Sequence, residues 1–278
     1  MNKLLAANFS RLKKDKMFWL GVLFMLAAGL AVPLVRYGNC IRFPDSEVPK
    51  SLEHEFFLYS NLVGVVLSIF SSMFIGAEYS NGTIRNKVVV GHARGAIYLS
   101  NLVVAATAGF AMCMSYMASY LCVGIPLFGF FEADLAKIVL FMLGTFFMVL
   151  ALSAIFTLVS MLNANKALVT VICILTSFVF LFAGTHFGAV LSTPETYPEY
   201  DVVNGETVVV GKFPNPNAVR GTERDVYEFL YDFTPGGQAV QYAEMKADQP
   251  QTLILYSAVI IAVATGAGLF FFRKKNLR

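Results

Sequence analysis

Long apolar runs dominate the chain and alternate with short polar stretches. A helix needs about 20 mostly apolar residues to cross a bilayer, where its backbone groups must be satisfied internally. Two of the runs exceed this length, so we expect their helices to tilt, or one of them to break near Pro126. The pattern predicts six transmembrane helices, over residues 17–35, 56–74, 98–128, 135–162, 167–191 and 253–272.

The composition agrees with this pattern. Of the 278 residues, 57% are hydrophobic and only 14% are charged, and the mean hydropathy is +0.64. These values exclude an ordinary soluble domain. They indicate an all-α polytopic membrane protein whose residues 1–278 form a single transmembrane domain.

Charges between the predicted helices indicate how the chain is oriented. If both termini lie in the cytoplasm, the cytoplasmic segments hold 13 basic and 2 acidic residues, and the opposite side holds 8 basic and 16 acidic residues. Short cytoplasmic loops of membrane proteins are enriched in Lys and Arg. We therefore expect a multi-pass protein of the plasma membrane with both termini in the cytoplasm.

The first 16 residues carry apolar positions at helical spacing. Met1, Leu5, Phe9 and Leu12 recur every three or four residues, and the cationic side chains lie largely elsewhere. This pattern predicts an interfacial helix over residues 1–16 that lies on the lipid of the inner leaflet. The alternative is a basic tail that only orients the first transmembrane helix. A cleaved signal peptide is not expected, because the next apolar run is long enough to span the membrane.

A polar stretch over residues 76–97 separates the second and third predicted helices. A carboxylate and glycine are unfavourable in a transmembrane helix, so Gly76 and Glu78 are expected to end the second one. Ser80 or Asn81 can cap a new short helix that starts near Gly82 and lies across the membrane axis. This helix would have an apolar side and a basic side, formed by Thr83, Ile84, Val88 and Val89 and by Arg85 and Lys87.

The stretch GAEYSNGTIRNKVVVGHARGAIYLSNL resembles the first cytoplasmic loop of bacterial type 2 ABC exporter permeases. In that family a glutamate-aromatic pair, then Gly-Thr and a basic residue, precede the third transmembrane helix. The overall pattern is also similar, with a basic amphipathic N-terminus, six transmembrane helices and a large outer segment before the last. The match is carried by Glu78, Tyr79, Gly82, Thr83, Ile84 and Arg85, followed by Arg94, Tyr98 and Leu99.

The resemblance implies a transport mechanism in the bacterial plasma membrane. Two permease subunits, identical or different, pair and each docks this loop on a separate cytoplasmic subunit that binds ATP and Mg. Glu78 would fix the pivot of the coupling helix, and Arg85 would pair with an acid on the ATPase or with Glu78 itself. The alternative is that both residues only anchor the loop at the level of the lipid headgroups. The coupling residues implied are Glu78, Tyr79, Ser80, Asn81, Gly82, Thr83, Ile84 and Arg85.

The segment over residues 192–250 is too long for a bare connection. Asn204-Gly205 suits a tight turn between two valine-rich strands, and ERDVYEFLYDF and TPGGQAVQYAEMKA predict two helices. Together they predict a small α/β cap on the extracellular side. The cap would guide a cationic substrate outward or form a lid without a substrate role. Its ten acids are Glu195, Glu199, Asp201, Glu206, Glu223, Asp225, Glu228, Asp232, Glu244 and Asp248, and its four bases are Lys212, Arg220, Arg224 and Lys246.

The predicted helices contain few polar side chains. Asn61, Ser68, Ser71 and Ser72 give the second helix a polar side and are candidates to line a transport path, although such residues commonly hydrogen-bond between helices. The sequence has no catalytic constellation or metal-ligand spacing, and its Gly211-Lys212 pair lacks the earlier glycine of a P-loop. We therefore expect no directly bound cofactor, no metal and no nucleic-acid partner.

These observations favour a permease subunit of an ATP-driven exporter, not an enzyme. A path without charges suits an amphipathic cargo, and a peptide is favoured: a toxin, a bacteriocin or an antimicrobial peptide, in export or immunity. Export of hydrophobic drugs or lipids is the alternative. A passive channel or a membrane anchor without ATP coupling is a further alternative.

Overall fold

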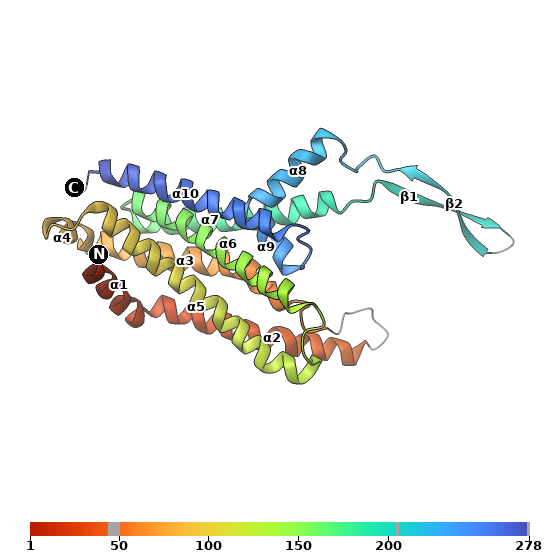
Figure 1. Cartoon of the computed structure of the whole chain (residues 1–278), viewed down its shortest axis with the longest axis horizontal. Helices are drawn as coiled ribbons and strands as arrows, with labels where there is room; N and C mark the ends of the chain where they lie inside the picture. The colour runs from red at the N-terminus through yellow and green to blue at the C-terminus, as the bar shows by residue number, and fades with distance from the viewer. Residues whose placement is uncertain (44–50, 204–205, 277–278) are drawn as a thin grey trace.

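A computed structural model describes residues 1–43, 51–203 and 206–276 of the chain (Figure 1). Six helices are long and apolar enough to cross a membrane, which confirms the predicted number. Five of them extend beyond their predicted apolar runs, because helical structure continues into the polar flanks, and α6 coincides with its predicted run. They are α2 (Lys16–Arg42), α3 (Tyr59–Ser80, entered through a 3-10 turn at Phe56–Leu58), α5 (Arg94–Phe128), α6 (Leu135–Leu162), α7 (Lys166–Leu191) and α10 (Pro250–Lys274).

Three of these helices form the interior of the bundle. The apolar windows of α3, α5 and α6 are 56%, 67% and 56% buried, whereas those of α2, α7 and α10 are 28%, 22% and 22% buried. The outer helices therefore present most of their apolar surface to lipid or to another subunit. α5 runs without interruption through Pro126 and ends two residues later, so the break considered near this proline does not occur.

Small residues let the helices approach closely within the chain. Gly109 of α5 lies against Val149 of α6, and a Cβ at position 109 would sit 2.7 Å from the valine Cγ1. Gly268 of α10 lies against the ring of Tyr98 in α5, and a Cβ there would sit 2.1 Å from the tyrosine Oη. Both glycines are therefore used for packing inside this subunit.

The two ends of the bundle differ (Figure 1). α1 (Asn2–Lys14), α4 (Thr83–Val89) and the C-terminal end of α10 gather at one end, which we call the α4 end. The other end, which we call the hairpin end, carries a two-stranded ribbon that projects away from the helices.

The ribbon confirms the predicted hairpin. β1 (Thr196–Val203) and β2 (Glu206–Pro214) pair antiparallel, from Thr196 opposite Pro214 to Val203 opposite Glu206, with an irregularity between Glu199 and Tyr200. The turn predicted at Asn204-Gly205 lies outside the described residues.

The two helices predicted after the hairpin are present, but only one of them is superficial. α8 (Thr222–Phe233) contains no buried residue, whereas every residue of α9 (Pro235–Ala243) is buried. α9 packs against α7, α6 and α3, and Gln238 accepts a hydrogen bond from Ser257 of α10 at 2.7 Å. The prediction that this second helix belongs to an exposed cap is therefore wrong. Its glycines and buried glutamines allow it to enter the bundle.

Candidate coupling site

The corner between α3 and α4 differs from its prediction. Gly76 and Glu78 do not end the transmembrane helix, because α3 continues to Ser80. Ser80 does not cap α4 either, since its hydroxyl donates back to the Gly76 carbonyl at 3.2 Å. The residue before α4 is Gly82, whose φ of 66° is in the left-handed region and reverses the chain without a side-chain cap.

Glu78 is the centre of a buried ion-pair cluster. Its side chain is fully inaccessible, and its Oε1 accepts hydrogen bonds from Arg11 of α1 and from Lys87 of α4. Its Oε2 accepts from Nδ2 of Asn101 in α5 at 3.0 Å. The Glu78 carboxylate, which belongs to α3, thus joins α3 to α1, α4 and α5.

Asn8 of α1 completes the cluster. Its Oδ1 accepts from Nζ of Lys87 at 3.0 Å, and its Nδ2 donates to Oγ of Ser100 at 3.1 Å and to Oδ1 of Asn101 at 3.4 Å. We refer to Asn8, Arg11, Glu78, Lys87, Ser100 and Asn101 as the Glu78 cluster.

The charges of the cluster explain why it holds together. Burial lowers the pKa of the Lys87 ammonium, and the adjacent Glu78 carboxylate opposes this shift by favouring the charged form. The Arg11 guanidinium lies over the ring of Phe74, 3.6 Å from the centroid, and also donates to the Phe74 carbonyl at 3.3 Å. Removing one member of such a cluster leaves buried charge without compensation, so α1, α3, α4 and α5 are coupled as one unit.

Two sequence interpretations are corrected by this arrangement. Arg85 does not pair with Glu78, and Lys87 and Arg11 take that role. The buried face of α1 consists of Leu4, Asn8 and Leu12, packed on α5, while Met1 is 63% exposed. The prediction grouped residues by apolar character alone. It therefore did not identify the face of α1 that packs on α5, because the middle residue of that face, Asn8, is polar.

The surface of α4 that faces away from the cluster is apolar and cationic. Ile84 is buried beneath the helix, whereas Arg85 is exposed. Val89 at the end of α4 and Val90 after it are 85% and 76% exposed. Val89 was predicted on the same apolar side as Ile84, but the helix turns it outward. The exposed valines at the α4 end form a small apolar surface beside the exposed side chain of Arg85.

The C-terminal end of α10 is held at the same corner. Arg94, at the start of α5, donates to the carbonyls of Phe272, Arg273 and Lys275. Nζ of Lys275 donates to Oη of Tyr79 at 2.9 Å and lies 4.1 Å from the centre of its ring. Tyr79 in turn donates to the Met161 carbonyl of α6. These contacts extend the coupled unit from the Glu78 cluster to α6 and α10.

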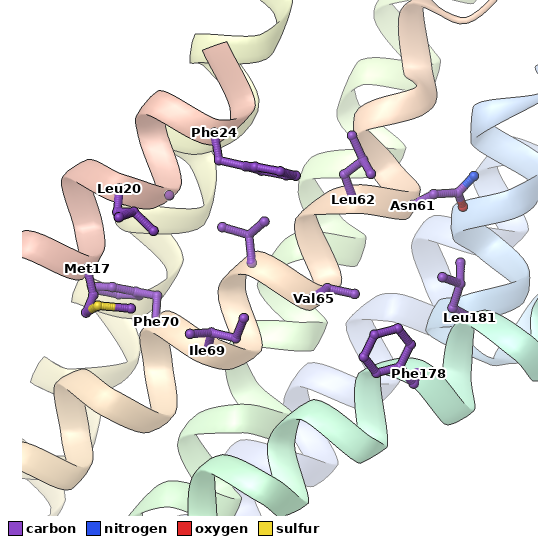
Figure 2. A pocket seen from close by; sticks show the side chains of 12 residues that line it. Met17, Leu20, Phe24, Asn61, Leu62, Val65, Ile69, Phe70, Phe178 and Leu181 are labelled. Atoms are coloured by element: carbon purple, nitrogen blue, oxygen red, sulfur yellow. The ribbon is translucent and has the colours of Figure 1, made fainter. Parts of the chain in front are cut away.

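An apolar groove opens between α2, α3 and α7 (Figure 2). It has a volume of about 490 Å³. Asn61 of α3 is the polar side chain among the lining residues, and its buried Oδ1 has no hydrogen-bond partner. The rest of the lining is apolar, formed by Met17, Leu20, Gly21, Phe24, Leu62, Val65, Val66, Ile69, Phe70, Phe178 and Leu181.

The predicted path residues do not lie together. Asn61 lines the groove, but Ser68, Ser71 and Ser72 are buried between helices. Ser68 and Ser72 donate to the Val65 and Ile69 carbonyls at 2.8 and 3.0 Å. Ser68 and Ser72 lie on nearly the same helical face as Asn61, but packing covers them further along α3, where Ser68 meets Oγ of Ser177 in α7 at 3.5 Å.

Among residues 1–43, 51–203 and 206–276, no group of three His, Cys, Asp or Glu side chains is arranged to hold a metal ion. The polar chemistry that the described residues offer at the α4 end is ion pairing and surface contact, which can transmit movement.

Comparison with known proteins agrees with this geometry. No curated protein matches the chain. A family model described as "ABC-2 family transporter protein" matches residues 4–184, which contain the Glu78 cluster, α4 and the groove. Such permeases span the membrane and work with an ATP-binding partner. The chain therefore belongs to the ABC-2 family of transporters, as a multi-pass membrane permease subunit.

Proposed function

We propose that this permease is an exporter of amphipathic peptides, pairs with a second permease subunit and has both termini in the cytoplasm. Its ATP-binding partner docks on the α4 end and supplies the ATP and Mg. The observation that carries the proposal is the pair of exposed valines, Val89 and Val90, on a short helix whose other side is anchored by a buried carboxylate.

The exposed surface of α4 suits a protein partner. Outside the membrane, adjacent apolar side chains with so little cover favour contact with another protein. Arg85 beside them can pair with a carboxylate of that partner, which would give the contact a defined orientation. We infer that α4 inserts Val89 and Val90 into a groove of the ATPase.

The path from the docking surface to the groove runs along one helix. Glu78 ties α4 to the last turn of α3, and the same helix lines the groove with Asn61, Val65 and Ile69. A movement of α4 driven by the ATPase would therefore shift one wall of the groove against α2 and α7. This is a rigid-element coupling, since the cluster resists separation of α4 from α3.

The groove favours an amphipathic cargo. An apolar surface accepts aliphatic or aromatic side chains, and the side-chain amide of Asn61, the polar group among the lining residues, can hydrogen-bond to the backbone of a peptide. A second permease subunit facing α2 and α7 would close the groove, because these helices are largely unburied. The wall is also compatible with a hydrophobic drug or lipid, which remains the second candidate.

Docking is tested by isolating the full-length permease together with its ATPase from the native membrane. Val89→Asp with Val90→Asp should abolish co-isolation, because two carboxylates would be buried in an apolar contact. Phe213→Asp at the other end is the control, since it adds a similar charge to an exposed apolar position. Full recovery of the ATPase by the valine double variant would exclude α4 as the docking element. Isolation of the wild type without any ATPase would favour a channel or anchor.

The cargo is tested on the reconstituted complex by peptide-stimulated ATP hydrolysis. Asn61→Leu should raise the peptide concentration needed for half-maximal stimulation roughly 5- to 150-fold, as expected from losing a hydrogen bond of about 1–3 kcal/mol. Ser72→Ala, which changes a buried serine away from the groove, should leave it unchanged. Stimulation by lipids or apolar drugs and not by peptides would replace peptide as the cargo class.

A further inference from the structure

α8 carries an apolar stripe that the described residues leave partly exposed. Val226, Phe229, Leu230 and Phe233 recur at helical spacing on one side, and Val226 and Phe229 are each 51% exposed. A water-soluble surface rarely leaves two such side chains open on one short helix. The opposite side of α8 is charged, with an exposed ion pair between Arg224 and Glu228 at 2.8 Å.

Aromatic contacts place this stripe beside a transmembrane helix. The rings of Phe229 and Phe233 stack with centroids 5.4 Å apart, and both meet Tyr256 of α10 edge-on at 5.9 and 5.6 Å. On its other flank, Tyr227 meets Phe187 of α7 at 5.8 Å. Figure 1 shows α8 lying obliquely beside the ends of α7 and α10 at the hairpin end.

The stripe continues the exposed apolar surface of a membrane-spanning helix. Next to Tyr256, α10 exposes Leu255, Val259 and Val263, one turn apart along a membrane-spanning helix. The aromatic side chains at this level correspond to the belt that membrane proteins place at the boundary of the hydrocarbon. An amphipathic helix with an apolar side toward lipid and a charged side toward water lies in that boundary.

We propose that α8 is an interfacial helix of the hairpin-end leaflet, with Val226, Phe229 and Phe233 inserted among the lipid chains. Thr234 alone separates α8 from the buried α9, so the leaflet anchors the segment that enters the bundle. The inference rests on the membrane-spanning fold and not on the proposed cargo or direction of transport. An interfacial position of α8 differs from the alternative in which α8 is part of a lid exposed to water.

The test uses the full-length chain in phospholipid vesicles with and without bromine on the acyl chains. Trp19 is the only tryptophan, so Trp19→Phe provides a background without tryptophan fluorescence. Single tryptophans are then introduced as Phe229→Trp and Val226→Trp in the stripe. Leu255→Trp on α10 is the lipid-facing reference, and Phe213→Trp on β2 is the reference outside the membrane.

Brominated lipid should reduce the fluorescence of the tryptophans at 226, 229 and 255 by about twofold, and leave the one at 213 unchanged. Because two stripe variants are made, misfolding of one does not prevent the comparison. If the tryptophans at 226 and 229 are quenched no more than the tryptophan at 213, the proposal is overturned. Unquenched but blue-shifted emission at both positions would also overturn it, and would assign the stripe to a second copy of the chain.

Discussion

The two ends of the molecule use charge in opposite ways. At the α4 end, Glu78 is fully buried and binds two cations from other helices, Arg11 of the distant α1 and Lys87 of the adjacent α4. At the hairpin end, the Arg224–Glu228 pair lies within one helix and both side chains are exposed. A buried ion pair couples the elements that carry it, whereas an exposed pair contributes little because water competes for both charges.

The helices of the α4 end are therefore coupled through buried charges, whereas the ion pair of the hairpin end lies within a single helix. The Glu78 cluster joins α1, α3, α4 and α5 through buried polar contacts, as the proposed docking surface requires. At the hairpin end, α8 contains no buried residue, whereas every residue of α9 is buried. The residues matched by the family model include the whole cluster and end at residue 184, before the ribbon.

The largest expected effect comes from removing the central carboxylate. Glu78→Ala leaves the largely buried Lys87 and the partly exposed Arg11 without their partner, so the unfolding free energy should fall by about 3–5 kcal/mol. The measurement is thermal or denaturant unfolding of the purified protein in mild detergent.

Glu228→Ala is the matched control at the hairpin end. It removes the acid of an exposed pair and should cost no more than about 1 kcal/mol. Equal effects of the two substitutions would contradict the distinction between the ends.

A smaller effect is expected where α9 enters the bundle. A Cβ on Gly236 would lie 1.7 Å from the Phe180 carbonyl oxygen of α7, so Gly236→Ala forces the two backbones apart. We expect a loss of about 1–3 kcal/mol of unfolding free energy. Gly38→Ala in α2 is the control, because no atom lies within 4 Å of its added Cβ. A neutral Gly236→Ala would mean that α9 is held as loosely as α8.

The smallest effect concerns pH at the α4 end. Burial lowers the pKa of Lys275 to about 8, whereas an unfolded lysine keeps its proton up to about pH 10.4. Between these values the unfolded chain binds more protons, so the docking of Lys275 should become more stabilising as pH rises. The rate of acylation of Lys275 should therefore have a midpoint near the lower value in the folded protein and near the higher one in denaturant. Identical midpoints in both states would refute the buried position.

Much of the architecture could be predicted because the bilayer imposes it. Apolar runs of membrane-spanning length predicted all six helices, since a polar backbone in hydrocarbon has few other solutions. The valine-rich strands around Asn204-Gly205 predicted the pairing of β1 and β2, because strand propensity and turn chemistry act over neighbouring residues. The short helix after α3 was also predicted, although its cap was not.

Partners that meet only in the folded chain could not be predicted. Arg11 and Glu78 are 67 positions apart, and Asn8 and Asn101 are 93 apart, so no local pattern joins them. The sequence did contain a signal at Asn8, because Leu4, Asn8 and Leu12 are four residues apart and lie on one helical face. A polar residue on a buried face can be interpreted only once its hydrogen-bond partners are known.

The sequence by itself therefore determined the number of membrane helices, the hairpin and the position of α4, because these depend on local hydrophobicity and turn residues. The tertiary structure decided which cations neutralise Glu78, that α9 is buried and that Asn61 faces a groove while the neighbouring serines do not. These outcomes depend on which helix faces meet, and that is set by close packing of the whole bundle.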